Sequence, residues 1–199
     1  MKVRITCSNT HWFGKEIAKI WDDVTFFSPS TNWDINNDDD LNSFVEDTDS
    51  YDLTVNFYVG YGFRATILLS RLQERCDRLG TEHVVLNIGS YQSFAILHNP
   101  SGTYDLEKSL LKLANRKVSL SRTYHNGKLD SRIINLSYIN GSEMLVDYPH
   151  IESLEIETIV DHIKFMMSTP SIKELSLQIK QPGNHRINEG LGPILRSVY

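Results

Sequence analysis

Three residues of this chain have the types and the order of a proton-transfer site. Tyr104 and Lys108 are four residues apart in a segment expected to be helical, so their side chains share one face. A free phenol has a pKa of about 10 and exchanges protons poorly near neutrality, but a nearby ammonium lowers that pKa. Ser90 precedes Tyr104 by fourteen residues, and its hydroxyl could hydrogen-bond the same substrate oxygen. These residues alone leave a second interpretation open, an exposed Tyr-Lys pair and a serine that only ends a strand.

The pattern of apolar residues predicts the elements that position these side chains. Strand and helix alternate along the chain, which predicts an α/β fold with a doubly wound parallel sheet of Rossmann-like type, in three α/β/α layers. Ligands of such a sheet bind beyond the carboxyl ends of its strands, where Ser90 would lie. Strands are expected at residues 2–7, 24–27, 53–58, 83–88, 132–138 and 175–179, and helices at 14–22, 38–47, 63–79, 103–116 and 156–168.

The whole pattern fits one domain over residues 1–181. The tail, residues 182–199, is rich in glycine, proline and asparagine. We expect it to be irregular, or to form an arm that contacts a partner subunit.

The order of these features resembles the short-chain dehydrogenase/reductase family over about residues 2–180. The resemblance is carried by a strand ending in Gly89-Ser90, a loop, Tyr104 and Lys108 in a Tyr-x-x-x-Lys helix, and the strand that follows it. It implies that Ser90 orients the substrate oxygen, Tyr104 is the acid/base, and Lys108 binds the nicotinamide ribose and lowers the Tyr104 pKa. The implied activity is NAD(P)-dependent oxidation or reduction of a carbonyl or secondary alcohol of an unknown small molecule.

The same resemblance suggests where a dinucleotide would bind. After the second strand the family's NAD-dependent members carry an acid, whereas this chain carries hydroxyl residues from Ser28 onward, so the prediction leans to NADP. The first loop keeps only the last of the family's three glycines. The implied cofactor-binding residues are Ser8, Asn9, Thr10, Phe13, Gly14, Ser28, Asp34, Ile35, Asn56, Lys108 and Ile139.

Two alternatives remain open at this point. The altered glycine loop, and the missing asparagine that the family uses as a fourth catalytic residue, favour a catalytically degenerate binding or regulatory protein with weak or no dinucleotide binding. A nucleotide-sugar epimerase also uses Tyr-x-x-x-Lys, but it normally needs a larger C-terminal substrate domain.

The composition and charge of the chain limit the classes of partner and the compartment that we expect. The net charge is −5 and no basic block occurs, which argues against nucleic acid. No apolar stretch approaches the roughly 20 residues of a membrane span. The histidines lack metal-ligand spacing. Cys7 and Cys76 form no disulfide framework, which suggests the cytoplasm. The resemblance implies a homodimer or homotetramer formed through helices 63–79 and 103–116.

Overall fold

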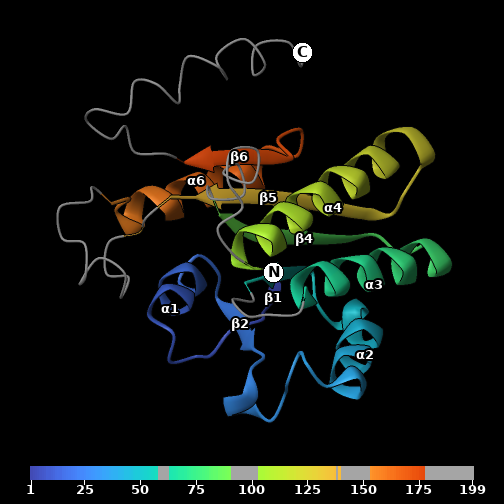
Figure 1. Ribbon diagram of the computed structural model, residues 1–199, viewed down its shortest axis with the longest axis horizontal. Helices are drawn as coiled ribbons and strands as arrows, with labels where there is room; N and C mark the ends of the chain where they lie inside the picture. Colours follow the sequence, from blue (N-terminus) through green and yellow to red (C-terminus); the bar gives the residue numbers. More distant parts are fainter. Residues whose placement is uncertain (58–62, 91–102, 138, 140–152, 178–199) are drawn as a thin grey trace.

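Six parallel strands form the centre of the protein. The computed structural model describes residues 1–57, 63–90, 103–137, 139 and 153–177 (Figure 1). The strands are hydrogen-bonded in the order β2-β1-β3-β4-β5-β6. Their bounds are Lys2–Ile5 (β1), Asp23–Phe26 (β2), Leu53–Asn56 (β3), His83–Ser90 (β4), Leu129–Leu136 (β5) and Glu174–Leu177 (β6).

Helices cover both faces of this sheet. On one face α1 and α6 pack into a single apolar cluster with the strands, and on the other face α2, α3 and α4 form a second cluster (Figure 1). The helices are Trp12–Ala18 (α1), Asp38–Glu46 (α2), Arg64–Leu79 (α3), Thr103–His125 (α4) and Ile156–Ser168 (α6), with 3₁₀ turns at Pro29–Thr31 (η1) and Asp47–Ser50 (η2). The predicted doubly wound, three-layer fold is confirmed.

The strand order reverses at β1, which lies between β2 and β3. Because all strands are parallel, their carboxyl ends meet at one edge, here called the carboxyl edge of the sheet. A reversal of this kind opens a crevice for ligands at that edge. The tail, residues 182–199, lies outside the described residues.

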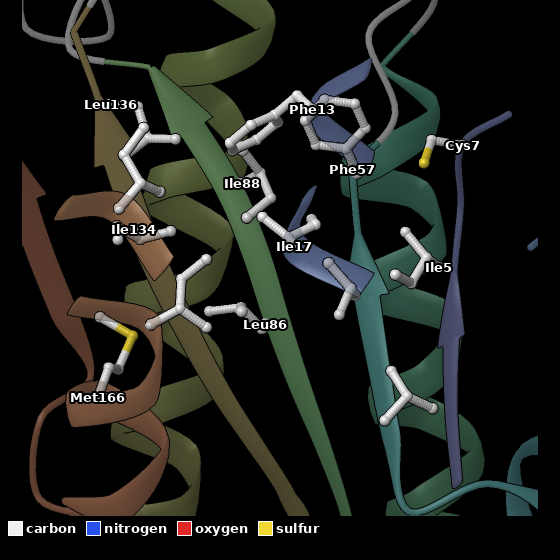
Figure 2. Close-up of a cluster of buried hydrophobic side chains, with 14 of the residues drawn as sticks. Ile5, Cys7, Phe13, Ile17, Phe57, Leu86, Ile88, Ile134, Leu136 and Met166 are labelled. Atoms are coloured by element: carbon white, nitrogen blue, oxygen red, sulfur yellow. The ribbon is translucent and has the colours of Figure 1, made fainter. Parts of the chain in front are cut away.

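The cluster between the sheet, α1 and α6 is closely filled at the carboxyl edge. Phe13 of α1 is 1% exposed, and its ring centroid lies 5.2 Å from that of Phe57, just after β3. Figure 2 shows these two rings beside Ile88, with Met166 deeper in the cluster. Burying side chains of this size contributes about 1.5–3 kcal/mol each.

Helix α4 extends nine residues beyond its predicted end at residue 116. Residues 117–125 contain valine, serine and threonine, which are weak helix formers. Two hydroxyls bond back within the helix, Ser119 to the Asn115 carbonyl at 2.9 Å and Thr123 to the Ser119 carbonyl at 3.0 Å. Val118 is buried against the sheet. Tertiary packing therefore overrides local propensity here. No helix in the described part of the chain is long and apolar enough to cross a bilayer.

Candidate active site

Ser90, Tyr104 and Lys108 meet at the carboxyl edge. Ser90 is the last residue of β4 and is 8% exposed. Its side chain lies near enough to the Tyr104 phenol, in the first turn of α4, to act on the pKa of that phenol. The ammonium of Lys108 lies 5.6 Å from the centroid of the Tyr104 ring. The structure thus brings together the three residues that the sequence singled out for proton transfer.

Burial governs the protonation of this group. It raises the pKa of the Tyr104 phenol, while the nearby Ser90 side chain opposes the rise and Asp105 adds to it. Burial also lowers the pKa of the Lys108 ammonium to about 8, against a smaller opposing effect of Glu107. Desolvation of the phenol therefore outweighs the lowering of the Tyr104 pKa that was expected from Lys108. The lysine faces the phenol ring and a backbone carbonyl, and desolvation of the phenol dominates.

Two contacts that sequence reasoning missed hold this end of α4. The Lys108 ammonium donates to the carbonyl oxygen of Ile88 at 3.2 Å. The carboxylate of Glu107, 8% exposed, accepts from the backbone N–H of Phe63 at 3.2 Å, next to the start of α3. The backbone acceptor at Ile88 leaves no signal in the sequence. Glu107 could have been singled out as an acid beside Lys108 on a helix face that must be buried.

Hydroxyl groups line the edge where β1 and β2 end. Ser8 and Thr10 follow β1, and their oxygens are 2.7 Å apart. Ser28 and Ser30 follow β2, and their oxygens are 2.8 Å apart. The Ser8 and Ser30 oxygens join the two pairs at 3.4 Å. We call these four residues the hydroxyl cluster. It lies at the strand reversal, with Asn9 exposed beside it.

The glycine that remains in the first loop has a packing role. Gly14 lies in the first turn of α1, where an added Cβ would overlap the Sγ atom of Cys7. The backbone N–H of Gly14 is directed at Nδ1 of His11, 3.4 Å away. The helix end that would face a phosphate is therefore capped by a side chain of its own loop.

Aromatic rings fill the space beside this loop. His11 and Trp12 are stacked at 6.2 Å, and His11 meets the edge of Phe57 at 5.0 Å. Phe13 packs on both Trp12 and Phe57. Phe13 was predicted to contact cofactor, but the structure places it in the hydrophobic core (Figure 2). A glycine loop would leave this space to a ligand.

Comparisons with known proteins support the fold and leave the chemistry open. No protein-family model matches the chain, and no curated protein matches it. An alcohol dehydrogenase from Comamonas testosteroni, specific for bulky-bulky ketones, is 10% identical with a TM-score of 0.66, covering 100% of this chain and 95% of that one. A short-chain dehydrogenase from Sphingobium yanoikuyae, in complex with NADPH, is 12% identical with a TM-score of 0.63, covering 100% and 97%. This chain has the fold of the short-chain dehydrogenases/reductases.

Within this short-chain dehydrogenase/reductase fold, the other predicted cofactor residues lie in different settings. Ile35 is 2% exposed and belongs to the core under α2 and α3, while Asp34 accepts from the backbone of Asn36 in the turn before α2. Asn56 ends β3 and is fully buried, and its Oδ1 has no hydrogen-bond partner among the described residues. Ile139 forms a parallel bridge with Leu154 beyond β5. Of these four residues only Asn56 ends a strand, and Ile139 follows the end of β5 by three residues.

Proposed function

We propose that the protein is an NAD(P)-dependent oxidoreductase of the short-chain dehydrogenase/reductase type, acting on a carbonyl or secondary alcohol of a small molecule. The observation that carries the proposal is the grouping of the Ser90 and Tyr104 side chains, with Lys108 one turn further along α4. A carbonyl oxygen that becomes an alcohol needs a proton donor and a hydrogen-bond donor at one point, and this pair offers both.

The side chains divide the chemistry among them. A nicotinamide dinucleotide supplies or accepts the hydride when bound at this edge. The Ser90 hydroxyl orients the substrate oxygen, and the Tyr104 phenol donates a proton to it. Because its pKa is raised, Tyr104 keeps this proton at neutral pH, which favours carbonyl reduction over alcohol oxidation there. The ammonium of Lys108 stabilises the phenolate that remains.

The hydroxyl cluster supports a preference for NADP. Its four side chains offer neutral donors where the two loops after β1 and β2 meet. A phosphate accepts such hydrogen bonds, whereas a carboxylate at the same place would repel it. We therefore assign the adenosine 2′-phosphate to the neighbourhood of Ser8 and Ser30.

One alternative function has specific support. The rings of His11 and Trp12 stand where the family's loop is glycine, and His11 already caps Gly14. These features favour a degenerate relative of the family, a binding or regulatory protein with weak or no affinity for dinucleotides.

Calorimetric titration with NADPH, NADH and their oxidised forms tests the choice. We expect micromolar binding, tightest for NADPH, that Lys108→Met weakens and Lys164→Met, a change at an exposed site on α6, leaves unchanged. Ser30→Asp should reverse the preference towards NADH, because a carboxylate repels the 2′-phosphate. Absence of heat with all four dinucleotides, on a protein shown to be folded, would reject the oxidoreductase in favour of the alternative.

We also propose that the chain assembles into a homodimer, or a homotetramer built from such dimers, through α4. The apolar face of α3 is used inside the subunit, where Leu68, Leu69 and Leu72 are fully buried. The outer face of α4 instead exposes large side chains with no cover from the described residues. These are Leu106 (43% exposed), Leu110 (36%), Leu113 (58%), Leu120 (55%) and Tyr124 (74%).

The spacing of this stripe suits a second copy of itself. With Lys117 included, its members follow one another at intervals of 4, 3, 4, 3 and 4 residues, and this series is the same in both directions. Two antiparallel α4 helices related by a two-fold axis would then pair Leu106 with Tyr124, Leu110 with Leu120 and Leu113 with Lys117 of the partner copy.

Sedimentation velocity tests the dimer. Leu120→Glu should yield monomers, because it places a charge opposite an apolar side chain, whereas Lys117→Leu should tighten the dimer by completing the stripe. Phe165→Glu is the matched control, since Phe165 is 52% exposed on α6 in the opposite layer. A dimer that survives Leu120→Glu would reject this interface.

We place the protein in the cytoplasm. Cys7 and Cys76 are both free and buried, and burial raises the pKa of the Cys7 thiol to about 12. Thiols kept in this unreactive state suit a reducing compartment.

A further inference from the structure

A closed set of hydrogen bonds between short polar side chains lies beneath the candidate site. Asn87 of β4, Asn115 of α4 and Ser131 of β5 are each at most 1% exposed. The Asn87 amide donates to Asn115 Oδ1 at 3.2 Å and to Ser131 Oγ at 3.0 Å. The Ser131 hydroxyl donates to Asn115 Oδ1 at 2.7 Å. We call these three residues the amide triangle.

The amide triangle is also tied to the strands around it. Asn87 donates to the backbone carbonyl of Arg132 at 3.1 Å, and its Oδ1 accepts from the Asn56 amide at 2.9 Å. The same Asn56 amide donates to the carbonyl of Ala65 in the first turn of α3 at 2.9 Å. One network therefore fixes α4 to three adjacent strands and to the start of α3.

Asn115, the member of the amide triangle on α4, lies on the same stripe of this helix as Tyr104 and Lys108. Asn115 follows Lys108 by seven residues and Tyr104 by eleven, which is close to two and three turns. A slip of one residue at Asn115 would move Lys108 by about 1.5 Å along the axis and about 100° around it. The register at the triangle therefore decides where Tyr104 and Lys108 stand relative to Ser90.

The Ser119 hydroxyl donates to the Ser131 carbonyl at 2.9 Å and supports the same register, whereas several other contacts of α4 tolerate such a slip more easily. Apolar packing is not directional, so Leu111 and Val118 do not specify one register. Lys112 and Arg116 reach Glu174 at 3.3 and 2.8 Å, but they do so with long side chains that can follow a shifted helix. The Asn87–Asn115 hydrogen bond joins two short side chains and is directional, and its loss leaves buried polar groups without partners.

We propose that Asn87 and Asn115 are positioning residues, whose hydrogen bond fixes the register of α4 on β4 and so holds Tyr104 and Lys108 against Ser90. Their catalytic meaning rests on the proposed function, but their effect on geometry does not. A buried asparagine that selects one helix register is known from coiled coils.

The titration of Lys108 followed by NMR in protein labelled with ¹³C-lysine tests the proposal, with Lys108→Met to assign the signal. In the parent protein burial lowers the Lys108 pKa to about 8. Asn115→Leu should raise it by roughly one unit or more, because the amine leaves its buried place. Val118→Ala is the matched control, since it removes buried packing from the same helix, and it should leave the Lys108 pKa unchanged.

Two further variants keep the test decisive if Asn115→Leu does not fold. Asn87→Leu with Asn115→Leu replaces the amide pair by apolar side chains, and such exchanges often preserve stability. Ser131→Ala removes one corner with little change in volume and should shift the Lys108 pKa in the same direction by less. An unchanged Lys108 titration in every variant that folds would overturn the proposal.

Turnover separates the proposal from the function on which it rests. In an active enzyme Asn115→Leu should lower kcat about 100-fold with little change in KM, because misplacement by about 1 Å has that effect. A shifted Lys108 pKa without any turnover in the parent protein would reject the oxidoreductase and keep the positioning role. Unshifted Lys108 in an active enzyme would reject the positioning role alone.

Discussion

A neutral histidine in the core should make the protein sensitive to mild acid. His83, the first residue of β4, is 5% exposed, and its Nε2 lies 2.8 Å from Thr54 Oγ1. Thr54 Oγ1 already accepts from Arg4 Nε at 2.7 Å, so its own proton is free to be donated to His83. This arrangement suits the neutral ring. Burial, and next the charge of Arg4, lower the His83 pKa to about 3.

The size of this effect on stability follows from the difference in the His83 pKa between the folded and the unfolded chain. The unfolded chain binds a proton at His83 below pH of about 6.5, while the folded protein stays neutral there down to about 3. The contribution of the neutral His83 to stability is therefore complete above about pH 6.5, and it falls by up to about 1.4 kcal/mol per pH unit below that value. Between pH 7 and pH 5 the expected loss is about 2 kcal/mol, a sizeable part of a typical 5–15 kcal/mol.

Urea denaturation at pH 7 and pH 5 measures this loss. His83→Gln keeps a neutral polar side chain without a titrating group, so its free energy of unfolding should fall by about 2 kcal/mol less than that of the parent protein over this range. His125→Gln, at an exposed position, serves as the control and should follow the parent protein. Equal losses in the parent protein and in His83→Gln would refute the reasoning.

Three more predictions concern the candidate site. Tyr104→Phe should lower turnover of a carbonyl substrate by about 10²–10⁴-fold, with cofactor binding by calorimetry retained; unchanged turnover would remove Tyr104 from the reaction. The rate of reduction should fall as pH rises through about 8, because Lys108 then loses the charge that stabilises the phenolate, and this break should be absent from the pH profile of Lys108→Met. Gly89→Ala should lower the free energy of unfolding in urea by about 1–3 kcal/mol, since its Cβ would overlap Asn135 Oδ1. Asn135→Ala in the same chain should restore most of that stability. Equal destabilisation with and without Asn135→Ala would contradict the clash.

The architecture could be predicted because it depends on periodicity. The apolar run of β4 and the alternation of strands with helices specify a parallel sheet before any contact is known. The end of α4 could not be predicted in the same way, since Ser119 and Thr123 are held by bonds and packing that only the folded chain provides. Likewise, β5 begins three residues early, because Asp130 and Arg132 are paired with each other inside the protein.

The candidate site was predictable in its residues and less so in its electrostatics. Because the strands are parallel, Ser90 lies at the carboxyl edge of the sheet, and α4 begins beside that edge. The grouping of Ser90 with Tyr104 and Lys108 therefore follows from the topology. The direction of the Tyr104 pKa depends on how deeply the phenol is buried, which spacing does not reveal. Asn87 could have been noticed as a polar residue inside an apolar strand, where it must find partners.

The carboxyl edge constrains the function differently at its two ends, one beside α4 and the other beside β1. At α4 the group of Ser90, Tyr104 and Lys108 is held by contacts within α4 and with β4. At β1 the glycine loop is replaced by rings, and Gly14 is kept for packing on Cys7. Changes in that loop should therefore alter which nucleotide binds, or whether one binds, without displacing Tyr104. Failure to bind dinucleotides would then argue for a binding role, and the geometry around Tyr104 would remain the same.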